Sequence, residues 1–83
     1  MYKLKVIDRA QKDLDAFQGE TFEKIKKRIL DLSGNPRPFG AIKLTQDEGY
    51  RIRVGDYRIL FRIDDTLKEV IIYRIKHRKD AYR

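Results

Sequence analysis

The organisation of the chain is clearest in residues 51–63, which read RIRVGDYRILFRI. Apolar and basic side chains alternate on both sides of the Gly55-Asp56 pair, and a Gly-Asp pair suits the tight turn of a β-hairpin. Alternate side chains of a strand point to opposite faces of a sheet. This stretch therefore predicts two adjacent antiparallel strands with one apolar face and one cationic face.

Three further segments with strand patterns surround this hairpin. Asp64-Asp65 is a second turn signal, and it leads into an apolar segment at residues 69–75. Residues 42–44 alternate ahead of the hairpin, and residues 2–7 alternate in the same way at the N-terminus. We therefore expect a mainly antiparallel sheet of four to five strands, one of them N-terminal.

Helical periodicity occupies the segment between the first strand and residue 33. Apolar residues three or four positions apart form two stripes, interrupted at residues 18–19; they are Ala10, Leu14 and Phe17, then Phe22, Ile25, Ile29 and Leu32. The short joint between the two helices predicts an antiparallel helix hairpin. The order βααββββ predicts a single α+β domain over residues 1–83, with the hairpin packed on one face of the sheet.

Strict alternation predicts which side chains form the apolar face that the helices need. They are Ile52, Val54, Tyr57, Ile59, Phe61, Ile63, Ile71, Tyr73 and Ile75. The opposite face then carries the cations Arg51, Arg53, Arg58, Arg62, Arg74, Lys76 and Arg78. A strand register shifted by one residue would bury these cations, at a high desolvation cost.

Composition narrows the classes of function. The 83 residues include 20 Lys and Arg and 13 Asp and Glu, a net charge of +7, and residues 50–83 carry ten of the basic side chains. The chain has no Cys and only short apolar runs, which excludes disulfides, thiolate sites and a membrane span. Because the N-terminus lacks an apolar signal segment, we expect a cytoplasmic protein. Nucleic acid or an acidic protein is the expected partner.

Two interpretations of the cationic face remain open from the residues alone. One is an ordinary solvated face, because antiparallel sheets often keep one side in water. However, such a face usually mixes charges of both signs, since like charges on neighbouring strands repel. Arg outnumbers Lys seven to three after residue 50, and guanidinium groups suit bidentate contacts to phosphate. The second interpretation is therefore a surface that binds a polyanion.

Few residues suit metal or nucleophilic chemistry. His77 is the single histidine and has no carboxylate pair at ligand spacing, so we expect no metal site and no cofactor. Ser33 is the single serine and lies in a helix-ending turn. Residues 76–83 form a dense basic cluster, which is either a charged chain end or part of the binding surface.

Two motifs relate the chain to a known family. Residues 49–61 read GYRIRVGDYRILF, and residues 75–83 read IKHRKDAYR. Together with the Asn35-Pro36 turn, they resemble the RelE/ParE superfamily of type II toxins over the whole chain. The resemblance implies a RelE-like fold and a cognate antitoxin. The RelE branch cuts mRNA in the ribosomal A site and the ParE branch inhibits DNA gyrase; the basic strand pair and the terminal tyrosine are closer to the RelE branch.

The resemblance also implies roles for individual residues. Arg51 and Arg53 stand where the RelE branch often has lysines that activate the 2′-hydroxyl and hold phosphate. Arg58 and Arg78 match cations that stabilise the phosphate and the leaving oxygen, and Tyr82 matches a tyrosine that stacks on or orients the base. The other cations that we expect to contact RNA are Lys43, Arg62, Arg74, Lys76, Lys79 and Arg83.

The general base is the open question in this assignment. A guanidinium does not release its proton near neutrality, so Arg51 and Arg53 are poor bases. His77, another group or the ribosome would then take the proton. His77 has the same parity as Ile75, so a regular strand turns it toward the core, and a hydrogen-bonded structural histidine is the alternative.

The resemblance thus implies a metal-independent, ribosome-dependent mRNA endonuclease that inhibits translation. Its expected partners are the ribosome, mRNA and an acidic, RelB-like antitoxin, and a heterotetramer with that antitoxin is one compatible assembly. Two alternatives remain: a ParE-like gyrase inhibitor, and an inactive toxin-fold protein that only binds its antitoxin.

Overall fold

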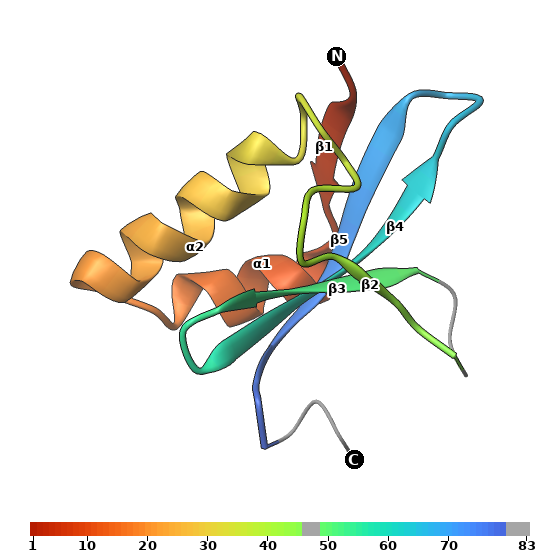
Figure 1. The fold of residues 1–83 in the computed structure, drawn as a ribbon. Coiled ribbons are helices and arrows are strands. Elements are labelled where there is room, and N and C mark those ends of the chain that lie inside the picture. Colours follow the sequence, from red (N-terminus) through yellow and green to blue (C-terminus); the bar gives the residue numbers. More distant parts are fainter. Residues whose placement is uncertain (46–48, 80–83) are drawn as a thin grey trace.

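The computed structural model describes residues 1–45 and 49–79 (Figure 1). Its elements follow in the order β1 (Lys3–Val6), α1 (Asp8–Asp15), α2 (Gly19–Asp31), β2 (Ile42–Lys43), β3 (Tyr50–Val54), β4 (Tyr57–Asp64) and β5 (Glu69–His77). The expected βααββββ order and the α+β fold class are confirmed. No helix among these residues has the length and apolar character needed to cross a membrane.

The strands form one five-stranded sheet in the order β1-β5-β4-β3-β2. β1 is parallel to β5, and the other neighbours are antiparallel. Parallel neighbours need a long crossover connection, and residues 7–68, which include both helices, supply it between β1 and β5. The N-terminal strand therefore lies at one edge of the sheet, and the short β2 lies at the other (Figure 1).

The hydrophobic core lies between the helices and one face of the sheet, as the apolar stripes predict. From the helices it contains Ala10, Leu14, Ile25, Ile29 and Leu32, and from the sheet Ile52, Ile59, Phe61, Val70, Ile72 and Ile75. The predicted helix-facing residues of β3 and the start of β4 are thus placed correctly. Both helices lie together on this side of the sheet (Figure 1), so the opposite side is left for the cations.

One part of the predicted core is wrong. Ile71 and Tyr73 were expected to face the helices, but both are only half-buried, whereas Val70 and Ile72 are fully buried. Phe61 pairs with Ile72 while its neighbour Leu60 pairs with Arg74, so Tyr73 is an extra residue in β5. This β-bulge shifts the alternation by one residue, and strict period-two reasoning fails across it.

Candidate functional site

The register of the central strands places three cations side by side, and we call them the cation row. Arg53 of β3 pairs with Arg58 of β4, and Arg58 pairs with Lys76 of β5. Directly paired residues point to the same face, with Cβ atoms about 4.5–5.5 Å apart. Arg51 lies two residues before Arg53 and therefore shares that face. The expectation that these four cations share a face is confirmed.

Arg51, Arg53 and Arg58 also line one cavity, of about 250 Å³, together with Gly40 and Ile42. We call it the arginine cavity. Arg53 is exposed, Arg51 is half-buried, and the Arg58 side chain is only 2% exposed. A guanidinium held in such a partly desolvated place interacts more strongly with an entering anion than one in bulk water. The three guanidinium groups that line the cavity are donors suited to bidentate contacts with a phosphate group.

The end of β5 brings two further predicted residues near the β3–β4 turn. The backbone N–H of Arg78 donates a hydrogen bond to the carbonyl oxygen of Asp56, at 2.7 Å. Arg78 and Lys79 are both exposed. Arg78 and Lys79 follow directly after β5, so this segment adds exposed positive charge at the end of the strand that carries Lys76.

His77 lies on the other face. It pairs with Tyr57, and the two rings meet edge to face with centroids 5.4 Å apart. Tyr57 in turn contacts Phe17, at 4.7 Å between ring centroids, on the side of the helices. The Nδ1 atom of His77 accepts a hydrogen bond from the backbone N–H of Lys79, at 3.3 Å. This arrangement corresponds to the structural alternative, because the sheet separates His77 from the arginine cavity.

Other predicted RNA contacts are scattered. Arg74 Nε donates to Asp13 Oδ2 at 2.8 Å, and the same oxygen accepts the backbone N–H of Ile75 at 2.9 Å. Asp13 thus covers the part of the β5 edge that β1 does not pair with. Lys43 pairs with Tyr50, so it shares the face that carries Tyr50 rather than the face of Arg51. The arginine cavity therefore contains neither Arg74 nor Lys43 among its lining residues.

Arg62 lies at the far end of β4, with its guanidinium 5.4 Å from the ring centre of Tyr73. It lines a second cavity, of about 580 Å³, beside the β4–β5 turn. We call this one the turn cavity. Its lining includes the carboxylates of Asp64 and Asp65, so it is less suited to an anion than the arginine cavity. Tyr82 and Arg83, the remaining predicted site residues, lie outside the described residues.

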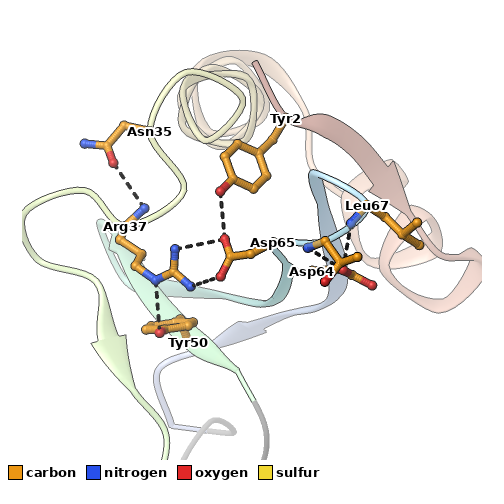
Figure 2. Close-up of polar contacts among 8 residues, drawn as sticks. Tyr2, Asn35, Arg37, Tyr50, Asp64, Asp65 and Leu67 are labelled. Atoms are coloured by element: carbon orange, nitrogen blue, oxygen red, sulfur yellow. Dashed lines mark hydrogen bonds and ion pairs between the residues drawn. The ribbon is translucent and has the colours of Figure 1, made fainter.

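A polar network at the turn cavity was not anticipated from the sequence. Figure 2 shows Arg37 donating two hydrogen bonds to the Asp65 carboxylate, at 2.8 and 3.2 Å, and a third from Nε to the Tyr50 hydroxyl at 3.2 Å. The Tyr2 hydroxyl donates to the same carboxylate at 2.7 Å. The hydrogen bonds from Arg37 and then Tyr2 lower the pKa of Asp65 to about 2, and the Asp65 contact raises the pKa of Arg37. Arg37 and Asp65 are 28 positions apart, so no local sequence pattern indicates their contact.

Comparison with known proteins shows the family and the fold of the chain. Residues 4–82 match the family described as "ParE toxin of type II toxin-antitoxin system, parDE". The chain is 34% identical to the toxin RelG of Mycobacterium tuberculosis, over 99% of this chain and 97% of that protein.

Two solved structures have the same fold. The toxin–antitoxin complex RelBE2 of M. tuberculosis matches with a TM-score of 0.81 and 28% identity, over 92% of this chain and 96% of that one. The RelB–RelE complex of Methanococcus jannaschii matches with a TM-score of 0.74 and 28% identity, over 94% of each chain. The chain therefore belongs to the RelE/ParE superfamily of type II toxin–antitoxin toxins, and within it to the RelE branch.

Proposed function

We propose that this toxin is a ribosome-dependent mRNA endonuclease whose reaction takes place at the arginine cavity. The observation that carries the proposal is the convergence of Arg51, Arg53 and Arg58 in that cavity, with Lys76 aligned beside Arg58. A phosphodiester is the common biological ligand for closely spaced guanidinium groups. A cavity of this size admits one phosphate group, which favours a strand with accessible phosphates over a flat protein surface.

The proposed reaction uses the RNA's own 2′-hydroxyl as nucleophile. The 2′-oxygen attacks the adjacent phosphorus, the bond from phosphorus to the 5′-oxygen breaks, and the products are a 2′,3′-cyclic phosphate and a 5′-hydroxyl. One proton leaves the 2′-hydroxyl and one reaches the 5′-oxygen. The protein's main contribution is fixed positive charge at the phosphate oxygens, where negative charge accumulates in the transition state. Arg58 has this role, and Arg51 and Arg53 hold the phosphate.

Lys76 is the described residue that best suits proton transfer at this cavity. Lysine amines serve as general bases in enzymes, whereas a guanidinium keeps its proton. Lys76 is half-buried and next to Arg58 in the cation row, while His77 points to the helix side. We therefore assign the proton transfer to Lys76 before His77, with Tyr82 and the ribosome as further sources.

The proposal includes an antitoxin. The similar structures from M. tuberculosis and M. jannaschii are complexes of a RelE-type toxin with a RelB antitoxin. A net charge of +7 favours an acidic partner here, and association should weaken as salt increases. An antitoxin over the cationic face would also deny RNA access to the arginine cavity.

The test is induction of the toxin in bacteria, followed by mapping of mRNA ends and DNA breaks. We expect mRNA cuts in phase with codons and growth that recovers when the antitoxin gene is co-expressed. Gyrase-linked DNA breaks would replace the proposal with the gyrase alternative. Normal growth with a folded protein would favour the inactive, antitoxin-binding alternative.

Two charge variants sharpen this test. Arg53 is exposed, so Arg53→Ala should leave the fold intact and reduce the mRNA cuts. Lys3 is exposed on β1, the edge strand that two strands separate from β3. Lys3→Ala therefore removes the same charge at a distance from the arginine cavity. Equal losses of cutting in the two variants would mean that overall charge matters and the arginine cavity does not.

A further inference from the structure

Phe39 occupies the tip of a tight turn in the segment between α2 and β2. The backbone N–H of Ala41 donates to the carbonyl oxygen of Pro38 at 3.0 Å, and Gly40 has a φ of +94°. A four-residue turn with a glycine of positive φ at its third position is a type II turn. Phe39 is the second residue of this turn, and its side chain is fully exposed.

An exposed phenylalanine means little by itself, because apolar atoms cover much of any protein surface. The position of Phe39 is more informative. The next residue, Gly40, lines the arginine cavity, and so does Ile42, which is itself half exposed. The aromatic ring is therefore attached one residue from the wall of a cavity that contains three arginines.

The segment that carries Phe39 is held on both sides of the turn. Before it, Arg37 is bound to Asp65 and Tyr50, and its backbone N–H donates to Asn35 Oδ1 at 3.2 Å (Figure 2). After it, Ile42 pairs with Arg51 in the sheet. The backbone of the turn is thus held relative to the cavity, so little loop-ordering entropy is lost when a ligand contacts the Phe39 ring.

We propose that Phe39 stacks on a base of the RNA whose phosphate occupies the arginine cavity. This inference rests on the proposed function. A single-stranded RNA carries one base for each phosphate, so a strand anchored at the cavity brings a neighbouring base to its rim. Aromatic rings beside cationic grooves bind single strands by stacking, with little dependence on base identity. Phe39 is then a substrate-positioning contact at the cavity's rim.

A fluorescence experiment tests the stacking directly. The chain has no Trp, so Phe39→Trp introduces a single indole at the turn. The variant is titrated with a fluorescein-labelled single-stranded RNA of about six nucleotides at low salt, and anisotropy of the label reports binding while indole emission reports stacking. We expect binding accompanied by quenching of the indole. A matched strand with abasic sugars should bind without quenching.

The outcomes separate this inference from the proposed function. RNA binding without indole quenching overturns the role of Phe39 and leaves the arginine cavity as an RNA site. The absence of any RNA binding overturns this inference but not ribosome-dependent cleavage, which the mapping of codon-phased mRNA cuts tests separately. Leu67→Trp serves as the matched control, because Leu67 is 63% exposed at the β4–β5 turn and does not line the arginine cavity. Equal quenching at position 67 would also overturn the proposal.

A second measurement uses ribosome-dependent cleavage with the intact toxin. Phe39→Ala should raise KM for mRNA by about 5- to 150-fold, the change expected from loss of one stacked base, with a smaller effect on kcat. Phe39→Tyr and Phe39→Trp should restore KM, whereas Phe39→Leu should not. Full recovery by Phe39→Leu would indicate an apolar contact to a protein partner and would overturn stacking.

Discussion

Arg58 and Arg62 lie four residues apart on the same face of β4, yet their surroundings differ in every respect that matters for binding. Arg58 is buried between Arg53 and Lys76 in the cation row and lines the arginine cavity. Arg62 is exposed over the ring of Tyr73, in a cavity that also contains Asp64 and Asp65. Among the described residues, the charged side chains paired with Arg58 are cations, whereas those around Arg62 include carboxylates. The comparison favours the Arg58 end as the proposed phosphate site and a structural role for the Arg62 end.

The largest expected effect is loss of cleavage at the Arg58 end. Arg58→Met keeps most of the side-chain volume and removes the charge, so mRNA cleavage should fall by about 10²- to 10³-fold, as for the loss of one preorganised donor. Arg62→Met should change cleavage by no more than a few fold. Single-turnover cleavage on programmed ribosomes measures both, with the thermal midpoint as a check on folding.

Arg58→Lys completes the series, because it restores charge without the planar fork of donors. Its activity should lie between that of the parent and that of Arg58→Met. A folded Arg58→Met protein with full activity, or an equal loss in Arg62→Met, would contradict the division of β4 into a binding end and a structural end.

The next largest expected effect is a loss of thermal stability on substitution of Gly49, at the Arg62 end of the sheet. Gly49 lines the turn cavity with a φ of +112°, and a β-carbon there would lie 2.3 Å from the carbonyl oxygen of Phe61. Gly49→Ala should therefore lower the thermal midpoint by roughly 10 °C, from backbone strain and the clash together. Calorimetry measures this directly.

Gly34→Ala is the matched control. Gly34 has an ordinary φ, and a β-carbon there would be 3.8 Å from its nearest neighbour, the carbonyl oxygen of Asp31. This replacement should leave the midpoint unchanged or raise it slightly, because it restricts the unfolded chain. Similar midpoints for the two variants would show that the close approach at Gly49 is relieved by a small backbone shift.

The smallest effect is the pH dependence of the Arg37–Asp65 pair. The pKa of Asp65 is lowered in the folded protein to about 2, so the pair contributes stability above the ordinary carboxyl range. That contribution is lost as the pH falls from about 4 toward 2. Both side chains are about half exposed, so the contribution should be small.

Comparison of the parent with Asp65→Asn measures this contribution. The parent should have the higher thermal midpoint at neutral pH, and the difference should shrink as the pH falls below about 4. Arg37→Met should behave like Asp65→Asn, and the double variant should add little to either. A difference that is independent of pH would mean that Asp65 acts through packing instead of charge.

Sequence patterns predicted the fold well where local periodicity governs it. The alternation of residues 51–61 identified β3, β4 and their turn, and the helical stripes identified the residues of α1 and α2 that face the core. The same alternation failed in β5, because the bulge at Tyr73 adds one residue to the strand. Val70, Ile71, Ile72 and Tyr73 are all apolar or aromatic, so their order contains no sign of where the parity changes.

The candidate site likewise has one part that the sequence predicted and one part that it did not. Arg51, Arg53 and Arg58 could be grouped from sequence, because a two-residue turn leaves little freedom in how β3 and β4 pair. Their convergence in one cavity with Gly40 and Ile42 was not predictable, since it depends on how the segment after α2 crosses the sheet. The ion pairs of Arg37 and Arg74 were hidden for a related reason: their partners, Asp65 and Asp13, are 28 and 61 positions away.

Alternation and helical spacing, which are properties of neighbouring residues, thus determined the order of elements, the helix-facing surface outside β5 and the excess of positive charge on the other face. The tertiary structure decided which cations gather in the arginine cavity and which pair with carboxylates of distant segments. That choice depends on strand register, on the bulge in β5 and on carboxylates contributed by distant segments. Electrostatic energy depends on distances between charges in space, and only the folded chain determines those distances.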